Sequence, residues 1–560
     1  MNVRAKMLLA AVLGFAILAA AAPPQGVANL KYLTDLSRCR PASALSERPR
    51  EGRWQLIPYE TLDDPNVKAG TMVGAASYVE APDITLPLGV SGWHAMYLGY
   101  WNPYHAYDGG ATIKARLSGD PSFIRLGEPE PHLEYEMKGS RYVSHTSLKE
   151  VFLRNADLTG RDLILGKVCG PFGQKAYLAY VKLAPLSPEE VTTLQAERAR
   201  TEARTLAGSI DGISYFWGSE YRKPEHLLEL VEPFRHSQVG KIIWAVNYGA
   251  TTNYPSEVGT LWEPPRDPAI RQSTNAYVKG EKVAGQSLTS YLERSIIPEE
   301  VVAPHVHGMG MQFDIMFRLG IAGFDLLPPR CGAKSKGFIA SHPECHMALA
   351  DGTRVEKASY AYPQVRAFML SLIGEATERF DVDGVCLGFV RGPEFLGYDP
   401  PVLEAFRLRY GEDATAVGFD DPRMRSVRSQ FMTRFVRDVR RVVDGVGRRK
   451  GKPLEVSAWL YPSVGQNLDY GFDVVGWINE GLLNSVIGAN DPEIVAAAQG
   501  GGCRIASAVW DIDGSADTAE GRSRDSKEVR DRAQDVSIRL RTLGGVDVGQ
   551  GYWDTAFSGG

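Results

Sequence analysis

After residue 205 the chain alternates short apolar segments with longer helical ones, and this alternation constrains the fold more than any other feature. Eight apolar segments have the length and composition of β-strands: 212–218, 241–249, 311–320, 383–391, 454–462, 483–490, 504–511 and 546–554. Strands that alternate with helices are typical of parallel βαβ units. Because eight parallel strands close a barrel, the pattern predicts an α/β fold with a (β/α)8 TIM barrel over 206–557. An open doubly wound sheet is the alternative.

Helical segments with one apolar face lie between the predicted strands. Segment 363–380 places Val365, Phe368 and Leu372 on one face, and segment 427–443 repeats the arrangement. Most arginines of the second segment fall on the opposite face, which predicts a solvated helix surface rather than an anion site. No glycine-rich phosphate loop follows a predicted strand, which argues against nucleotide binding.

The region before residue 187 has a different pattern. Residues 50–186 contain six short runs rich in β-branched and aromatic residues, separated by Gly, Pro, Asn and Asp. This spacing predicts an N-terminal antiparallel β-sandwich, which either binds carbohydrate or braces the barrel. Ser187, Pro188 and Glu190 then form a helix start signal, so we expect a connecting helix over 187–205.

The first 26 residues have the pattern of an export signal. Arg4 and Lys6 precede an apolar run that extends from Met7 to Ala22 and ends in small residues. This predicts a signal peptide over 1–26 and a secreted or periplasmic protein with no stable membrane insertion after cleavage. A membrane-anchoring helix is the alternative.

Charge and cysteine content narrow the possible partners. The formal net charge of −5 provides no positive field for a polyanion, so nucleic acid is not an expected partner. The oligomeric state stays open. Six cysteines are too few for a disulfide scaffold; Cys331 and Cys345 form the pair best suited to a bridge, and Cys386 reads as a buried hydrophobe.

Aromatic and carboxylate side chains follow the predicted strands. In a TIM barrel the active site gathers at the carboxyl ends of the strands. A sugar ring has an apolar face for stacking and a polar rim for hydrogen bonds, so this combination indicates a carbohydrate substrate. The predicted substrate-binding residues are Trp217, Tyr248, Arg318, Arg391, Trp459, Tyr461, Trp510, Asp513 and Trp553. For each tryptophan, burial in the core is the alternative.

Glycosidic cleavage needs two carboxyl groups, one that protonates the leaving oxygen and one that acts at the anomeric carbon or its water. Glu394 follows the fourth predicted strand after Gly392 and Pro393, and Asp511 follows the seventh. We therefore expect Glu394 and Asp511 to be the catalytic pair. The alternative for Glu394 is an ion pair with Arg391 or Arg318. Asp383 is less suitable, because it begins a strand and would lie at the opposite face of the barrel.

Other polar groups have less direct interpretations. Arg318 and Arg391 either pair with Glu394 or Asp325, or clamp a carboxylate or sulfate of the substrate. His305 and His307 precede the third predicted strand and are expected to support the opposite face or a long loop. His342, Glu344 and His346 offer metal-capable side chains, but no second ligand pair follows at a suitable distance, so we expect neither a metal nor another cofactor.

Two segments resemble a known family. Residues 362–391 form a helix that leads into a DGV strand ending in Arg, and residues 473–487 pass from an Asp through Trp477 to a strand. Both resemble glycosyl hydrolase-like family 10 barrels and related secreted bacterial glycosidases over about 205–557. The resemblance implies a barrel that acts on glycans. Where that group has acidic residues on the fourth strand this chain has Gly388 and Phe389, and Asn484 replaces an Asp.

The combined prediction is a secreted glycoside hydrolase that cleaves a polysaccharide or oligosaccharide by a two-carboxylate mechanism. A non-catalytic glycan-binding protein on the same scaffold is the alternative.

Overall fold

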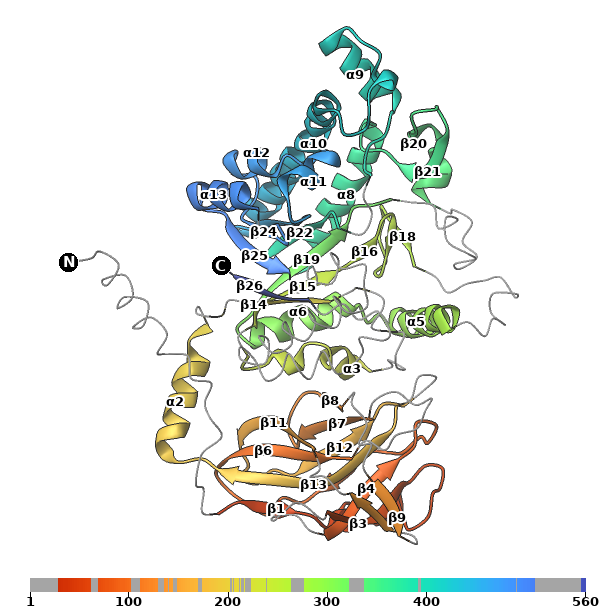
Figure 1. Cartoon of the computed structure of the whole chain (residues 1–560). Helices are drawn as coiled ribbons and strands as arrows, with labels where there is room; N and C mark the ends of the chain where they lie inside the picture. The colour runs from red at the N-terminus through yellow and green to blue at the C-terminus, as the bar shows by residue number, and fades with distance from the viewer. Residues whose placement is uncertain are drawn as a thin grey trace, which may run out of the picture.

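The structure is a computed structural model (Figure 1). It describes residues 29–61, 69–101, 111–128, 135–138, 141–144, 149–169, 174–201, 204, 206–210, 212, 216, 223–237, 239–262, 276–321, 337–390, 394–489, 491–508 and 555–559. Two β-sheets form its N-terminal part. The larger sheet has nine strands in the order β11-β6-β13-β4-β3-β10-β9, with β1 on β13 and β2 on β3; the smaller has the order β5-β12-β7-β8.

The strands of the larger sheet are β1 (Lys31–Leu33), β2 (Leu45–Ser46), β3 (Trp54–Thr61), β4 (Ala69–Ala75), β6 (Trp93–Tyr100), β9 (Tyr135–Lys138), β10 (Arg141–Ser144), β11 (Lys149–Asp157) and β13 (Ala176–Pro185). Those of the smaller sheet are β5 (Ile84–Leu86), β7 (Ala111–Leu117), β8 (Ile124–Glu128) and β12 (Leu163–Lys167). The six runs predicted as strands between residues 50 and 186 all coincide with strands of these two sheets.

The two sheets share one hydrophobic core. Trp54 and Leu98 from the larger sheet and Ile113 and Leu165 from the smaller one belong to the same cluster, and none of these four side chains is exposed. Alternate residues of each strand supply this core, because successive side chains of a strand point to opposite faces. Most pairs are antiparallel, but β2 and β10 each pair in parallel with β3.

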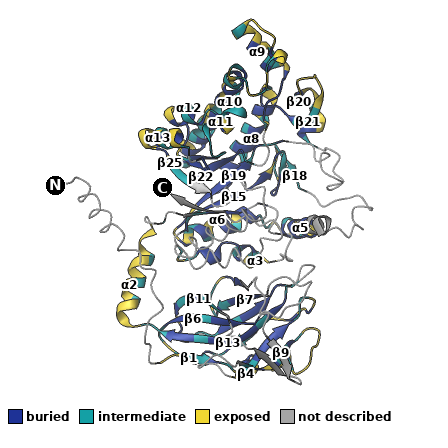
Figure 2. Ribbon diagram, viewed as in Figure 1, coloured by how far each residue is buried: buried dark blue, intermediate teal, exposed yellow. Residues whose placement is uncertain are grey.

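Helix α2 (Pro188–Ala199) follows the larger sheet and begins where the sequence predicts. Ser187 accepts a hydrogen bond from the Glu190 backbone N–H, and the Glu190 carboxylate accepts one from the Ser187 backbone N–H. This capping box satisfies two backbone donors that the first helical turn leaves free. No residue of α2 is buried, as the yellow and teal helix in Figure 2 shows.

Eight strands form a closed ring in the second part of the chain. In ring order they are β14 (Leu206–Ile210), β15 (Val239–Ala245), β19 (Gln312–Arg318), β22 (Gly384–Gly388), β23 (Glu455–Trp459), β24 (Ser485–Ile487), β25 (Arg504–Ala508) and β26 (Thr555–Gly559). Neighbours from β14 to β25 pair in parallel. Strand β26 pairs antiparallel with both β14 and β25. The ring is therefore mixed, whereas the sequence predicted eight parallel strands.

Helices connect most of the parallel strands. They are α3 (Pro224–Leu228), α5 (Ala276–Leu292), α6 (Pro298–Gly308), α7 (Phe338–Ser341), α8 (Pro363–Arg379), α9 (Pro400–Tyr410), α10 (Pro422–Lys450), α11 (Val464–Asp469), α12 (Val474–Asn479) and α13 (Pro492–Gly501). Two small sheets lie in the connections, formed by β16 (Asn247–Tyr248), β17 (Thr251–Thr252) and β18 (Thr260–Leu261), and by β20 (His346–Ala348) and β21 (Arg354–Ala358).

Six predicted strands coincide with strands of the ring, and two do not. The first ring strand is Leu206–Ile210, not 212–218. The predicted segment 546–554 lies outside the described residues, and Thr555–Gly559 occupies the eighth place.

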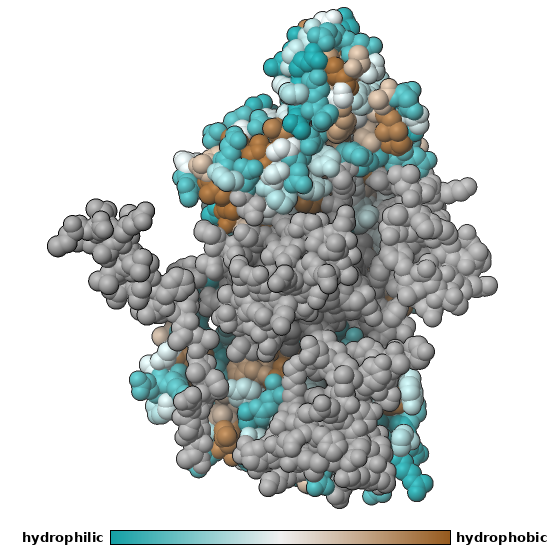
Figure 3. Space-filling view, viewed as in Figure 1, coloured by the Kyte–Doolittle hydropathy of each residue, from teal (hydrophilic) through white to brown (hydrophobic). Residues whose placement is uncertain are grey.

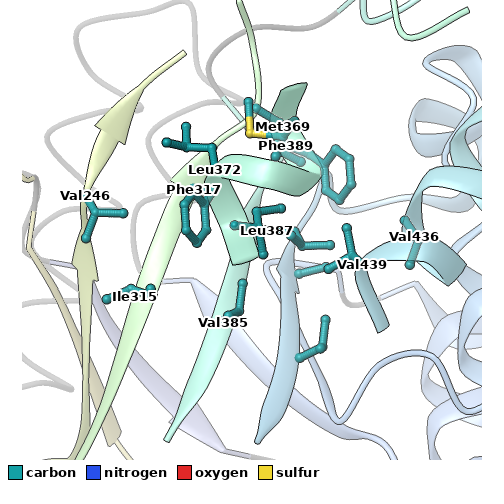
Figure 4. Packing of buried hydrophobic residues seen from close by; sticks show 14 of the residues in the cluster. Val246, Ile315, Phe317, Met369, Leu372, Val385, Leu387, Phe389, Val436 and Val439 are labelled. Atoms are coloured by element: carbon teal, nitrogen blue, oxygen red, sulfur yellow. The ribbon is translucent and has the colours of Figure 1, made fainter. Parts of the chain in front are cut away.

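The ring strands pack against helices on the outside. Ile315 and Phe317 of β19 and Val385 and Leu387 of β22 belong to a cluster that includes side chains of α8 and α10, such as Leu372 (Figure 4). Alternate residues point to the ring interior, where Met316 and Cys386 pack together in a separate cluster. This period of two fixes which side chains can reach the interior and which face the helices.

Four charged residues lie on ring strands, near the amino ends of those strands. Lys241 Nζ lies 2.6 Å from Asp314 Oδ2 and 2.7 Å from Glu455 Oε2, and Arg504 Nη2 lies 2.5 Å from the same Glu455 oxygen. We call these four residues the amino-end cluster. Burial alone would lower the pKa of Lys241, but the two carboxylates raise it above its usual value.

An ion triad joins the two parts of the chain. Glu229, which follows α3, accepts hydrogen bonds from Lys114 Nζ of β7 at 2.6 Å and from Arg125 Nε of β8 at 2.9 Å. All three residues are largely buried. Because a carboxylate in such a position needs its cations, this contact fixes the smaller sheet against the start of the ring.

Of the three cysteines with a specific prediction, the structure describes Cys345 and Cys386 but not Cys331. Cys345 has a free, buried thiol, so it forms no bridge to Cys331, which lies outside the described residues. Cys386 is fully buried, as predicted.

Among the described residues, no helix has both the length and the apolar character that a bilayer span requires. The predicted signal peptide lies outside them.

Candidate functional site

Glu394 lies six residues beyond the carboxyl end of β22, and its side chain is 56% exposed. Its backbone φ is +70°, in the left-handed region that non-glycine residues seldom adopt. Only His236 and Ser295 share a positive φ among the other described non-glycine residues. A strained residue persists only where its surroundings hold it, and such residues concentrate at functional sites.

Glu394 pairs with Lys357 among the described residues, with Nζ 3.7 Å from Oε2. The sequence suggested Arg391 or Arg318 as ion-pair partners; Arg391 lies outside the described residues, and the structure adds Lys357 of β21 as a partner. Burial lowers the pKa of Lys357, and the Glu394 carboxylate opposes that shift. The two side chains form a partly buried pair of opposite charges that borders solvent.

A buried carboxylate holds the backbone around this pair. Asp399 accepts hydrogen bonds from the backbone N–H groups of Ala348 and Gly397, both at 2.8 Å, and from Ser359 Oγ at 2.5 Å. These bonds tie the segment after Glu394 to the β20–β21 hairpin. A Cβ at Gly397 would lie 2.2 Å from the Ala348 carbonyl oxygen, so this close approach requires glycine.

The hairpin is also tied to the ring. Tyr360 donates from its hydroxyl to the Leu319 carbonyl at 2.7 Å, and its backbone N–H donates to the Phe395 carbonyl at 2.8 Å. The backbone N–H of Ala358 donates to the Ile321 carbonyl at 2.8 Å. Lys357 and Glu394 therefore come from two connections that are both fixed to the carboxyl end of β19.

Two tyrosines complete the surroundings of Glu394. Burial raises the pKa of Tyr461 well above its usual value, with further contributions from Tyr470 and from the Glu394 carboxylate. Burial and the same carboxylate also raise the pKa of Tyr470. The two rings lie with centroids 5.1 Å apart. The Asn467 amide fixes the Tyr461 backbone, accepting from its N–H at 3.1 Å and donating to its carbonyl at 2.8 Å.

Arg318 and Tyr248 meet at the carboxyl ends of β19 and β15. The Arg318 guanidinium lies over the Tyr248 ring, 5.3 Å from its centroid. Asn247 positions both, because its side chain accepts from the Arg318 backbone N–H at 2.8 Å and donates to the carbonyls of Arg318 and Gly249. Tyr248 is 41% exposed, so its outer face is open to a ligand.

Trp459 does not form an open stacking surface. It is only 5% exposed and packs inside the ring with Ile243, Met316 and Ile487. The side chain at the end of β23 points inward, where it closes the packed interior. This burial favours a core role over the sugar-stacking role predicted from the sequence.

Several predicted site residues lie outside the described residues: Trp217, Arg391, Trp510, Asp511, Asp513 and Trp553. Among the predicted residues that the structure describes, Glu394 and Tyr461 belong to one site. Arg318 and Tyr248 form a second pair at the same end of the ring.

Lys357, Tyr470 and Asn467 were not predicted from the sequence. Lys357 lies on β21, in the connection after β19. The one local signal for Asn467 is its place four residues after Ser463, whose side chain caps α11. Such contacts depend on how connections meet, which periodicity does not encode.

The histidines and Asp383 lie where the sequence indicated. His307 Nε2 lies 2.9 Å from Asp383 Oδ2, and His305 Nε2 lies 2.9 Å from Glu232 Oε2, both away from the carboxyl ends of the strands. His342 Nδ1 and His346 Nε2 contact the carbonyls of Phe338 and Ile339. The described residues contain no group of three or more metal-capable side chains.

No family model matches the sequence, and no curated protein matches it. The resemblance to glycosyl hydrolase-like family 10 barrels therefore stays a prediction.

Solved structures that match the chain include three glycoside hydrolases. Alpha-L-fucosidase isoenzyme 2 from Paenibacillus thiaminolyticus is 11% identical over 51% of this chain and 41% of its own, with a TM-score of 0.30. A glycoside hydrolase family 18 N-acetylglucosaminidase from Paenibacillus barengoltzii is 11% identical over 50% and 51%, with a TM-score of 0.23. The PgaB glycoside hydrolase domain from Bordetella bronchiseptica is 12% identical over 53% and 80%, with a TM-score of 0.30. The chain thus spans about half or less of the first two proteins, and these likenesses are too distant to assign a role to any residue.

Proposed function

We propose that this protein hydrolyses glycosidic bonds in a polysaccharide or oligosaccharide, with Glu394 as the general acid/base. The observation that carries the proposal is the position of Glu394. Its carboxylate is exposed beyond the carboxyl end of a ring strand, its own φ is left-handed, and buried hydrogen bonds fix the backbone that follows it. A proton-transfer group needs both access to the substrate and a fixed direction.

Asp511 is the proposed second carboxylate. It comes three residues after Ala508, the last residue of β25, so it follows the carboxyl end of a ring strand. A two-carboxylate mechanism requires a nucleophile or base across the scissile bond from the acid, and another ring strand can supply it.

The surrounding groups have proposed roles in binding. Tyr248 and Tyr461 offer aromatic surface to the apolar face of a sugar, and Arg318 and Lys357 offer donors to its oxygens. Trp217, Trp510, Trp553, Arg391 and Asp513 remain proposed contacts.

The proposed enzyme is a variant of the (β/α)8 barrel, closed by one antiparallel strand and preceded by a two-sheet domain. Export with a signal peptide over 1–26 is part of the same proposal.

A non-catalytic glycan-binding protein is the second candidate. One observation favours it: the end of β22 has no carboxylate, since its last residue is Gly388 and the next, Phe389, is fully buried against Phe395 and Phe472. Such a protein would retain the aromatic and polar groups for binding but would not cleave the glycan.

Comparing the Glu394→Gln variant with the wild type on a panel of glycans tests both candidates. We expect kcat to fall by about 100-fold or more, while equilibrium binding changes by less than about threefold. Glu404→Gln is the matched control, because Glu404 is exposed on α9 and pairs with Arg407. An unchanged rate in Glu394→Gln would remove Glu394 from the mechanism. Binding without release of reducing ends by the wild type would support the second candidate.

A further inference from the structure

A cleft of about 810 Å³ lies on the outside of the ring, between α10 and the chain that forms α11 and α12. We call it the α10 groove. Helix α10 lines it with Ser429, Phe431, Arg434 and Arg437, and the facing wall includes Asp473 and Glu480. In Figure 3 hydrophilic residues cover much of the described surface around α9 and α10. The sequence predicted only a solvated helix surface here, but the structure places this surface in a groove of ligand size.

The lining of α10 forms a continuous polar stripe. Ser426, Gln430 and Arg434 recur every four residues and therefore lie on one side of the helix. Ser429 and Thr433 repeat the spacing one position away, and the Thr433 hydroxyl accepts a hydrogen bond from Trp477 Nε1 at 2.8 Å. The stripe offers donors and acceptors along about two turns of helix.

One of these polar atoms lacks the partner that burial normally demands. Ser429 is only 9% exposed, and its Oγ has no hydrogen-bond partner in the described part of the chain. Buried hydroxyls are nearly always hydrogen-bonded, because an unpaired one loses its interaction with water. A ligand hydroxyl in the groove would satisfy Ser429.

The three arginines of the groove differ in their partners. Arg425 Nε donates to Asp469 at 2.7 Å, and Arg437 forms two hydrogen bonds of 2.6 Å with Glu480. Arg434 is exposed and has neither a carboxylate nor a hydrogen-bond partner among the described residues. It lies close enough to Arg366 for the two positive charges to repel, and the pKa of Arg366 is lowered by burial and by this repulsion, which the Asp438 carboxylate opposes. One anionic group at Arg434 would relieve it.

We propose that the α10 groove binds an acidic oligosaccharide, with a uronate carboxylate on Arg434 and a ring hydroxyl on Ser429. A guanidinium matches a carboxylate through two parallel hydrogen bonds. Phe431 offers apolar surface to a sugar face, and the carboxylates of Asp473 and Glu480 accept hydroxyl hydrogens. The same carboxylates disfavour a polyanion of high charge density, which separates uronates from nucleic acid. The choice of a saccharide rests on the proposed function.

The groove lies near the Glu394 site along the chain. Leu468 lines the groove, and Tyr470, two residues later, lies beside Tyr461. The groove therefore lies close in sequence to the tyrosine pair beside Glu394.

Binding of defined hexamers to the full chain tests the proposal. Hexagalacturonate, hexamannuronate and the neutral cellohexaose are titrated calorimetrically into the Glu394→Gln variant, which limits turnover. For the uronate hexamer that binds more tightly, Arg434→Gln is expected to raise Kd about tenfold and Ser429→Ala about threefold. The matched control is Arg441→Gln, which removes an arginine of α10 that pairs with Asp438 and does not line the groove.

Several results would overturn the proposal. These are no binding of either uronate hexamer, equal Kd values in the presence and absence of the Arg434 guanidinium, or equally tight binding of cellohexaose. Ser429→Ala removes only an unpaired hydroxyl, so its fold is expected to survive even if Arg434→Gln unfolds. Failure of the proposed function is separate: the wild type would then release no reducing ends, while the Kd ratio at Arg434 would still report on the groove.

Discussion

The two ends of the ring use charged residues in opposite ways. At the amino ends, every member of the amino-end cluster has an opposite charge within 2.7 Å, and Asp314 is fully buried. At the carboxyl ends, Glu394 is more than half exposed, and its partner among the described residues, Lys357, is 3.7 Å away. The first arrangement satisfies its charges within the protein, and the second leaves a carboxylate that can interact with something else.

This difference shows that the charged residues at one end of the ring stabilise the fold, while the candidate catalytic carboxylate lies at the other end. Buried charges are tolerated only with close partners, so the amino-end cluster commits its groups to the fold. Near Glu394 the hydrogen bonds instead fix the backbone, because Asp399 ties the segment after Glu394 to the hairpin that carries Lys357. Substitutions at the two ends should therefore have separable effects on unfolding and on activity.

Removing Lys241 should have the largest effect on stability. Lys241→Met leaves Asp314 buried without its cation, and the free energy of unfolding should fall by about 3–5 kcal/mol at neutral pH. Urea unfolding measures the loss. The double variant Lys241→Met/Asp314→Leu removes both charges and should recover much of it. A double variant less stable than Lys241→Met would contradict this assignment of the cost.

The sequence predicted the ring better than it predicted its rim. β22 is apolar throughout, and the interiors of β19 and β23 are apolar apart from Asp314 and Ser457, so burial on both faces is visible in their composition. β14 was misplaced because Leu206–Ile210 contains Ala, Gly and Ser, which give a weak strand signal, whereas 212–218 is aromatic.

The candidate site was predicted only in part, because its contacts join distant connections. Glu394 was identified from its place after a strand, but Lys357 lies 37 residues earlier in another connection. Trp459 shows a second gap: the sequence places it at a strand end but does not say whether it points to the rim or into the interior.

Glu299 should make stability depend on pH through a single buried carboxyl. It lies in α6, accepts a hydrogen bond from Trp244 Nε1 at 3.1 Å, and has no partner for Oε2 within the described ranges. Burial raises its pKa from 4.5 to about 7. The folded state therefore prefers the protonated form, and this contribution is complete below pH 4.5 and is lost as pH rises through about 7.

Glu299→Gln should remove that dependence. Relative to the wild type, the variant should gain on the order of 3 kcal/mol of unfolding free energy between acidic pH and pH 8. Urea unfolding at both pH values measures the difference, with the exposed Glu493→Gln as control. A constant offset between Glu299→Gln and the wild type would show that Glu299 has a similar pKa when folded and unfolded.

Lys357→Met should affect activity more than stability. If the ammonium group orients Glu394 or a substrate oxygen, kcat/KM should fall about tenfold. Because the pKa of Lys357 is lowered, the wild-type rate should decline with rising pH at values below 10.5, and this alkaline decline should be absent from the variant. Lys452→Met, at the amino ends of the strands, is the control that should leave the pH profile unchanged. An unaltered alkaline limb in Lys357→Met would restrict Lys357 to a packing role.

The smallest effect should come from an ion pair that serves neither end of the ring. Arg449 lies 2.6 Å from Glu378 on the surface, and both side chains are largely exposed. Arg449→Gln should change the free energy of unfolding by less than about 0.5 kcal/mol, because water screens the pair and ordering two long side chains costs entropy. A loss as large as that of Lys241→Met would mean that the N–O distance, and not burial, determines how much each ion pair contributes to stability. The contrast between the two ends of the ring rests on burial, so similar losses at both positions would remove its basis.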